Sequence, residues 1–494
     1  MKSSIVALAA TLLAATSSHA IDLVERSAPA VVSLDTVRRH VRDPVHRDGL
    51  RRRAKTLLET LDNEETLYFA NVSLGTPPQT LRLHIDTGSS DMWMNSPDAR
   101  ICNVRGNPCS DSGTYNANKS SSYKFVSSDF NISYQDGSAA LGDYATDTLH
   151  LGRTDIRAVQ FGIGYQSSSP ESILGIGYKA NEVQVNRNNK PAYPNLPQAM
   201  KDAGLINSVA YSLWLNDLDA STGSILFGGV DSEKYHGELQ TLPVENDVGQ
   251  DSPSEFIITV TGVGLNQSGN VQAMGGSVRD DPVLLDSGSS LMYLPNDVVS
   301  DIYDAVNAEY DQQSQNAFVD CSLANDDTSL SFTFTSPTID VSMSELIIDP
   351  GTAQDGSQIT LNDGTTPACL FGIAPAGNTG AVLGDTFLRS AYVVYDLSNN
   401  QISLAQTNFN STRSNVREIG TGKNAVPDAT GVANVKTASP SQTVGGRIGG
   451  FSGSATGLGA PSATSTSTAG VAHATKVPQY AMAGLAGAGL LFAL

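Results

Sequence analysis

The sequence predicts a mostly β protein built from two related lobes, and two internal repeats carry this prediction. The first repeat, Ile85-Asp86-Thr87-Gly88-Ser89-Ser90, returns about 200 residues later as Leu285-Asp286-Ser287-Gly288-Ser289-Ser290. The second, Ser172-Ile173-Leu174-Gly175, is echoed at nearly the same offset by Ala381-Val382-Leu383-Gly384. Each copy sets an apolar run before a glycine-containing turn, as at the end of a buried strand. Such an offset is too long for a solenoid and suits a duplicated lobe.

The first repeat places one aspartate, Asp86 or Asp286, at the end of a buried strand in each half. One Asp-Thr-Gly alone is compatible with an ordinary turn, but two matched copies favour a shared site. Gly88 and Gly288 permit tight turns whose N–H groups can face a carboxylate. Two adjacent carboxylates share one proton, so the pair can activate water and polarise a carbonyl. Four hydroxyl groups can hold this arrangement in place: those of Thr87, Ser89, Ser287 and Ser289.

The same segments resemble the active-site signatures of pepsin-like aspartic proteases. The first signature reads Asp86-Thr87-Gly88-Ser89-Ser90-Asp91-Met92-Trp93, and the second reads Asp286-Ser287-Gly288-Ser289-Ser290. The resemblance extends from about residue 67 to about residue 407. It implies a bilobal fold with two pseudo-twofold-related β lobes and a cleft between them. It also implies an endopeptidase that cleaves extended polypeptides with catalytic Asp86 and Asp286 and needs no cofactor.

A hairpin is predicted around Asp136-Gly137, between strands over about 130–134 and 139–146. From the sequence alone, a plain surface hairpin is the favoured interpretation. The family resemblance instead implies a flap over the substrate. In that interpretation Tyr134, Gly137 and Ser138 contact substrate, and Trp93 is the indole that hydrogen-bonds to Tyr134.

The composition excludes several functional classes. The formal charge of −20 argues against nucleic acid as a partner, since phosphate binding needs a basic surface. Neither His-Glu-x-x-His nor Gly-x-Ser-x-Gly occurs, so metalloprotease and serine-hydrolase interpretations have no starting point and no metal is expected. Four cysteines suggest two disulfides, a short loop closed by Cys102 and Cys109 and a longer one closed by Cys321 and Cys369. The resemblance implies the same pairing.

The first 65 residues are interpreted as processing segments. Residues 1–20 have the basic start, short apolar core and small-residue end of a secretory signal peptide. Residues 21–65 lack a globular pattern and are rich in arginine over 38–55. This basic stretch is either a solvated helix or a propeptide that neutralises an acidic cleft until low pH, and its position favours the propeptide. The run Arg51-Arg52-Arg53-Ala54-Lys55 is also a candidate processing site.

The expected catalytic lobes are residues 66–248 and 249–408. In the second lobe, Asn296 is expected to cap a helix over about 298–312, with an apolar stripe of Val298, Ile302, Val306 and Tyr310. Residues 409–470 are rich in Gly, Ser and Thr and are expected to form a disordered stalk. Residues 471–494 match a glycosylphosphatidylinositol (GPI) attachment signal, with Gly470 as the best candidate for the anchored residue; the alternative is a disordered apolar tail.

An extracellular address is the overall expectation. The GPI anchor would tether the protein, which is expected to be a monomer, to the outer membrane leaflet or the cell wall. The propeptide is expected to be a second partner. Five Asn-x-Ser/Thr sequons support this address: Asn71, Asn118, Asn131, Asn266 and Asn410. Asp91 and the hydroxyl-rich tail make the chain more similar to the yapsin-type fungal branch than to digestive pepsins.

Two alternatives from other functional classes remain. A catalytically silent, peptide-binding surface glycoprotein would share the fold, and an adhesin would explain only the stalk. One residue departs from the family pattern: His84 stands two positions before Asp86, where an apolar residue is usual. It is either a packed, satisfied histidine or a charge that shifts the pH profile.

Overall fold

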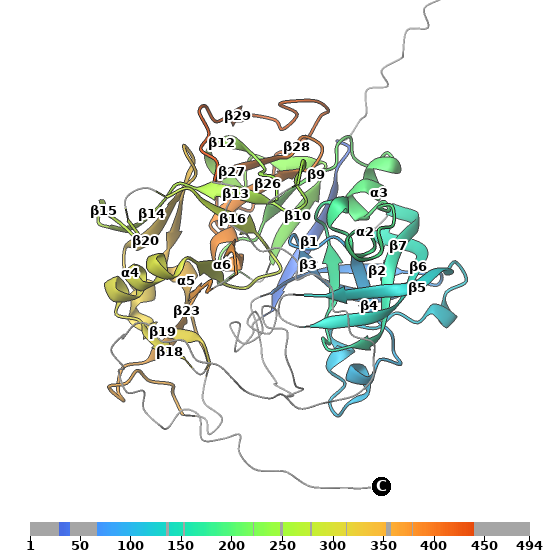
Figure 1. Cartoon of the computed structure of the whole chain (residues 1–494), viewed down its shortest axis with the longest axis horizontal. Helices are drawn as coiled ribbons and strands as arrows, with labels where there is room; N and C mark the ends of the chain where they lie inside the picture. The colour runs from blue at the N-terminus through green and yellow to red at the C-terminus, as the bar shows by residue number, and fades with distance from the viewer. Residues whose placement is uncertain are drawn as a thin grey trace, which may run out of the picture.

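The computed structural model describes residues 29–39, 67–134, 138–151, 154–220, 222–247, 250–276, 279–312, 314–351, 357–377 and 379–438. The described chain is mostly β, as the sequence predicts. In Figure 1 the earlier part of the chain, from blue to green, lies on the right, the yellow part lies on the left, and orange to red strands lie at the top between them. Strands from both parts meet between them, which is the two-lobed arrangement expected from the internal repeats.

A large sheet runs through the first lobe and the middle of the molecule. Its strands are β1 (Val32–Arg39), β2 (Leu67–Leu74), β3 (Gln79–Asp86), β4 (Met92–Asn95), β5 (Lys124–Ser133), β6 (Ala139–Leu151), β7 (Thr154–Ser167), β8 (Ser172–Gly175), β9 (Ala210–Trp214), β10 (Thr222–Phe227), β12 (Tyr235–Pro243), β26 (Ala391–Asp396), β27 (Gln401–Thr407) and β29 (Ala429–Gly431). In the described residues the order is β29-β12-β27-β26-β9-β10-β1-β2-β3-β8-β4-β7-β6-β5. Because β26 and β27 come from the second half and pair with β9 and β12 of the first, this sheet joins the lobes.

Smaller sheets build the second lobe. One contains β13 (Ile257–Val260), β16 (Asp281–Leu285), β25 (Ala381–Leu383), β17 (Met292–Leu294) and β24 (Ile373–Pro375). Another contains β15 (Asn270–Ala273), β14 (Gly262–Gln267), β20 (Thr328–Thr333) and β21 (Thr338–Ser342). A third contains β18 (Glu309–Asp311), β19 (Asn316–Asp320), β23 (Ala368–Phe371) and β22 (Ile347–Ile348). A separate pair is formed by β11 (Gly229–Asp231) and β28 (Val416–Glu418).

The helices are short and lie around these sheets. Their bounds are α2 (Val183–Asn188), α3 (Leu196–Asp202), α4 (Asn296–Val306), α5 (Met343–Leu346) and α6 (Asp385–Leu388). Helix α4 corrects the expectation of a helix to residue 312, because Asn307 adopts a left-handed conformation with φ 53° and ends it. Tyr310 therefore lies in β18, not on the helix, and Asn296 is the first helical residue while Pro295 is the cap.

Strand β1 lies inside the segment 21–65 that shows no globular pattern in the sequence. It pairs antiparallel with β10 on one side and with β2 on the other. Leu34 and Thr36 are buried while Ser33 and Asp35 are exposed, which is the alternation of a half-buried strand. The strand is thus an interior member of the large sheet, and its removal would leave two unpaired edges.

The predicted start of the disordered stalk, residue 409, is too early in the chain. Residues 409–438 are described and packed: β28 pairs with β11, and β29 runs parallel to β12. Ile419 and Val426 are buried in a cluster with Trp214, Leu239 and Tyr392. Strand pairing, hydrogen bonds to Asp231 and these apolar contacts together hold a segment whose composition resembles a linker. Residues 439–470, Gly470 and 471–494 lie outside the described residues.

Both disulfides that the sequence suggests are formed. Cys102 bonds to Cys109, and Cys321 bonds to Cys369. The described residues include no helix long and apolar enough to cross a membrane.

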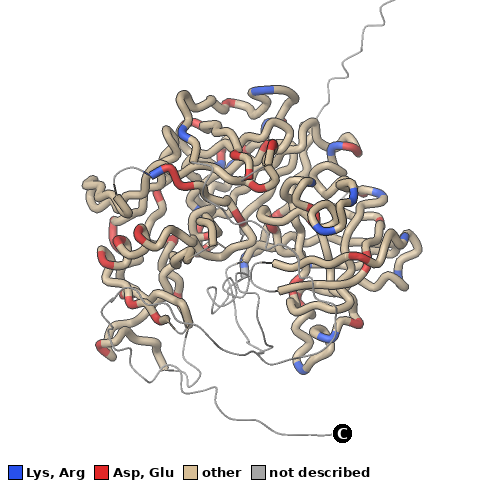
Figure 2. Tube along the Cα trace, viewed as in Figure 1, with Lys and Arg blue, Asp and Glu red and all other residues tan. Residues whose placement is uncertain are grey.

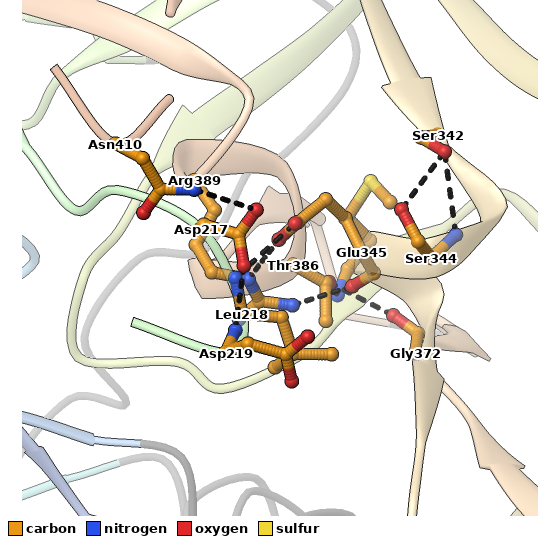
Figure 3. A network of polar contacts seen from close by, with 11 residues as sticks. Asp217, Leu218, Asp219, Ser342, Ser344, Glu345, Gly372, Thr386, Arg389 and Asn410 are labelled. Atoms are coloured by element: carbon orange, nitrogen blue, oxygen red, sulfur yellow. Dashed lines mark hydrogen bonds and ion pairs between the residues drawn. The ribbon is translucent and has the colours of Figure 1, made fainter. Parts of the chain in front are cut away.

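A buried ion pair of the second half also accepts a hydrogen bond from the first half (Figure 3). The Arg389 Nε donates to Glu345 Oε2 at 2.6 Å, and both side chains are almost fully buried. The backbone N–H of Leu218, from the first half, donates to the other Glu345 oxygen at 3.1 Å. Burial raises the pKa of the Glu345 carboxyl group, and this effect outweighs the lowering of the same pKa by Arg389. Removing one member of such a pair leaves an uncompensated buried charge and destabilises a protein by about 3–5 kcal/mol.

Candidate active site

Two equivalent strand pairs position the two aspartates. In the first lobe, β3 runs parallel to β8, with Asp86 opposite Gly175. In the second lobe, β16 runs parallel to β25, with Leu285 opposite Leu383, and the N–H of Asp286 donates to the Leu383 carbonyl at 3.1 Å. The second sequence repeat therefore supplies the strands that support the catalytic loops. Strands β8, β16 and β25 are buried and read as short apolar runs, whereas β3 alternates, with Arg82 between Leu81 and Leu83.

The loops bring the two carboxylates together. The N–H of Gly88 donates to Asp86 Oδ1 at 2.9 Å and to Asp286 Oδ1 at 3.1 Å. The N–H of Gly288 donates to Asp286 Oδ1 at 2.8 Å. One oxygen of each aspartate thus lies at the same backbone donor, although the residues are separated by 198 positions or more along the chain. Asp86 is buried and Asp286 is half-buried, so their interaction is poorly screened by solvent.

The remaining carboxylate oxygens are held by serine hydroxyl groups. Ser89 Oγ donates to Asp86 Oδ2 at 2.5 Å, and Ser289 Oγ donates to Asp286 Oδ2 at 2.9 Å. This equivalence follows directly from the sequence repeat. Each aspartate is therefore fixed at both oxygens, which orients the pair before any substrate arrives.

The hydroxyl groups of Thr87 and Ser287 cross between the loops. Thr87 Oγ1 donates to the Leu285 carbonyl at 2.9 Å and accepts from the Ser287 N–H at 3.0 Å. Reciprocally, Ser287 Oγ donates to the Ile85 carbonyl at 3.0 Å and accepts from the Thr87 N–H at 3.2 Å. Four buried hydrogen bonds thus fix one loop against the other.

The two glycines are required by close approach, not by backbone angle. A Cβ atom at Gly88 would lie 2.6 Å from Asp286 Oδ1, and one at Gly288 would lie 2.5 Å from Asp86 Oδ1. Neither distance is compatible with a side chain. The glycines therefore let each loop touch the carboxylate of the opposite lobe.

The predicted hairpin is present in its described part. Ser133 of β5 pairs with Ala139 of β6, and the N–H of Tyr134 donates to the Ser138 carbonyl at 2.9 Å. Trp93 Nε1 donates to Tyr134 Oη at 2.7 Å, the contact that the resemblance implies. Gly137, which the sequence places at the turn, lies outside the described residues.

Asp91 has a structural role that the sequence did not reveal. Its carboxylate is buried and accepts hydrogen bonds from Tyr144 Oη at 2.9 Å, Tyr193 Oη at 3.0 Å and the Val183 N–H at 2.9 Å. These contacts tie the first catalytic loop to the base of the hairpin and to helix α2. Tyr193 is 102 positions away in the chain, so no local sequence signal could have identified it.

Within the described residues, no group of three or more His, Cys, Asp or Glu side chains could hold a metal ion. In Figure 2, acidic positions are spread over both halves of the described chain, with basic positions scattered among them.

The predicted glycosylation sequons differ in accessibility. Asn71, Asn118 and Asn410 are exposed, whereas Asn131 and Asn266 are half-buried. The Asn131 side-chain oxygen also accepts a hydrogen bond from Arg187 at 2.6 Å. The three exposed sequons remain the better predictions.

Comparison with known proteins decides the family. A model of the family "Eukaryotic aspartyl protease" matches residues 67–407, which is most of the chain and includes both aspartate loops. The chain belongs to the eukaryotic aspartyl protease family. The protease is 53% identical to the probable aspartic-type endopeptidase opsB of Aspergillus oryzae, over all of both chains. It is 38% identical to an acid protease of Saccharomycopsis fibuligera, over 71% of this chain and 83% of that one.

A solved structure supports the fold. The crystal structure of the aspartic proteinase from Irpex lacteus matches with a TM-score of 0.55 and 20% identity, over 78% of this chain and all of the other. Its identity is too low to transfer residue roles, so it supports the pepsin-like architecture alone. Together with the family match, these comparisons identify the protease as an aspartic-type endopeptidase.

Proposed function

We propose that Asp86 and Asp286 form a catalytic dyad that hydrolyses peptide bonds in extended polypeptides. The observation that carries this proposal is the Gly88 N–H, which is bonded to one oxygen of each aspartate and so brings the two carboxylates to a single point. Two carboxylates so close cannot both ionise readily, and the pair holds one proton. The ionised member then accepts a proton from water while the protonated member donates to the substrate carbonyl oxygen.

The same dyad completes the reaction without a covalent intermediate. Water adds to the carbonyl carbon, and the C–N bond then breaks as the amide nitrogen receives a proton from the dyad. The products are a carboxylic acid and an amine, and the dyad regains its single proton. Substrate in this proposal lies beneath the hairpin that carries Tyr134, which the Trp93 indole holds in place. Tyr134 serves to position substrate and takes no part in proton transfer.

Acid-favoured activity follows from the shared proton. A dyad that loses its last proton as pH rises no longer has the donor for the carbonyl oxygen. The similarity to a protein named an acid protease supports this preference. We therefore expect cleavage to be faster at acid than at neutral pH.

Maturation and location complete the proposal. Residues 1–20 direct secretion, and residues 21–65 act as a propeptide whose strand β1 is inserted between β10 and β2. The arginine-rich stretch that follows β1 has the charge to shield an acidic site. Residues 471–494 are removed and a GPI anchor is attached to Gly470 in their place, which holds the protease at the cell surface.

The competing function is a silent surface glycoprotein that binds peptides without cleaving them. The mature protease should cleave denatured casein or haemoglobin at acid pH, and a statine-type transition-state mimic should abolish that cleavage. Peptide binding without inhibitor-sensitive cleavage would favour the silent glycoprotein and contradict the proposal.

A further inference from the structure

His84 lies in β3, two residues before Asp86, and its side chain is completely buried. Its Nε2 atom lies 3.3 Å from the carbonyl oxygen of Ser287, in the catalytic loop of the opposite lobe. A carbonyl oxygen can only accept a hydrogen bond, so Nε2 must carry the proton in this contact. Both the neutral Nε2–H tautomer and the imidazolium form meet this requirement.

The contacted carbonyl belongs to a peptide unit that also binds a catalytic carboxylate. The Ser287 carbonyl and the Gly288 N–H are the two ends of one planar peptide group and point in opposite directions. The Gly288 N–H donates to Asp286 Oδ1 at 2.8 Å. A donor on the carbonyl therefore fixes the direction of the N–H, and it also polarises the peptide group so that the N–H donates more strongly.

Neighbouring side chains hold the imidazole in place. Phe69 is the cross-strand partner of His84, and the two ring centroids are 5.5 Å apart. The guanidinium of Arg82 lies over the Phe69 ring, 4.6 Å from its centroid. Because Phe69 is also buried, the imidazole cannot swing away from Ser287 without opening the core.

The contact has no counterpart in the other half of the repeat. Leu284, which precedes Asp286 by the same two positions, is an apolar buried residue without a hydrogen-bonding side chain. The bonds of Thr87 and Ser287, in contrast, are reciprocal. The two catalytic loops are thus fixed symmetrically by their hydroxyl groups and asymmetrically by His84.

We propose that His84 is a positioning residue for Asp286, acting through the Ser287–Gly288 peptide group. This inference rests on the proposed dyad chemistry and adds a specific asymmetry to it. The histidine acts as a hydrogen-bond donor that crosses from one lobe to the other. It orients Oδ1 of Asp286 through this peptide group and does not itself touch the reacting atoms.

Three substitutions test this role by the reach of the side chain. His84→Gln places an amide N–H near the position of Nε2, His84→Asn reaches only the position of Nδ1, and His84→Leu has no donor. Leaving a buried carbonyl without its donor should lower kcat about tenfold to hundredfold in the Leu and Asn variants. We expect KM to change less than about twofold, and the Gln variant to recover most of the lost kcat.

The control Phe69→Leu removes the ring that packs on His84 and keeps the donor. Thermal unfolding and kcat are measured for all four variants on the same mature preparation. A Gln variant as impaired in kcat as the Leu variant would overturn the inference, as would wild-type kcat in the Leu variant. If the Asp86→Asn variant is inactive while all His84 variants have wild-type kcat, only the role of His84 fails. If wild-type cleavage is insensitive to the statine-type mimic, the proposed function itself fails.

Discussion

The hydroxyl group of Thr87 makes two of the four hydroxyl hydrogen bonds that cross between the catalytic loops. The substitution Thr87→Val keeps the shape of the side chain and removes both bonds. The Leu285 carbonyl and the Ser287 N–H then lose this partner in a region where Thr87 and Ser287 are at most 1% exposed. A buried polar group without its partner costs about 1–3 kcal/mol, so the variant should lose about 2–6 kcal/mol of stability.

This loss corresponds to a measurable shift in melting temperature. An unfolding entropy of about 2.1 cal/mol/K per residue over roughly 340 residues converts 1 kcal/mol into about 1.4 °C. The Thr87→Val variant should therefore melt about 3–8 °C below the wild type in differential scanning calorimetry. Its kcat should also fall, because the same bonds hold Asp86 and Asp286 at their common point.

Thr87→Ser is the matched control, because it keeps the hydroxyl and loses only a methyl group. It should retain most of the stability and the kcat. The reciprocal variant Ser287→Ala should resemble Thr87→Val, and the double variant should cost less than the sum of the two. A Thr87→Val protein with wild-type melting temperature and kcat would refute this account of the loops.

Three further predictions concern other parts of the molecule. Gly288→Ala should abolish casein cleavage, because its Cβ would lie 2.5 Å from Asp86 Oδ1. In the same assay Gly431→Ala should keep wild-type activity, because its Cβ would meet nothing within 4 Å. Burial raises the folded-state pKa of Asp396. The contribution of this group to stability is therefore complete below its unfolded pKa and is lost as pH rises through its folded pKa. Melting temperatures measured from acid to neutral pH should show Asp396→Asn gaining stability relative to the wild type as pH rises, and a constant difference would contradict this. A chain truncated after residue 408 loses the buried Ile419 and Val426 and should melt well below one truncated after residue 438, whereas equal melting temperatures would mean that this segment does not stabilise the fold.

The sequence was sufficient for those parts of the protein that are repeated or locally patterned. The two Asp-(Thr/Ser)-Gly-Ser copies predicted both loops, and Ser89 and Ser289 hold the carboxylates as their equivalent positions suggested. The strands that end at Gly175 and Leu383 were recognisable because burial on both faces makes a strand uniformly apolar.

Other features depend on contacts between distant segments and left no local signal. Strand β1 has a short alternation inside a basic segment, and only pairing with β10 and β2 makes it a strand. Helix α4 stops at Val306 because Asn307 turns into the left-handed region, while the apolar stripe continues past it. The packed segment 409–438 looks like a linker in composition, because only a few apolar side chains and pairing with the distant strands β11 and β12 hold it.

The central claim is that Asp86 and Asp286 act as one unit. Its most direct test is the kcat of Asp86→Asn, Asp286→Asn and the double variant, measured on purified protein whose melting curves show a folded state. We predict that each single variant loses essentially all activity and that the double variant is no worse than either, because the missing function belongs to the pair. Substantial activity in either folded single variant, or losses that multiply in the double variant, would contradict the account.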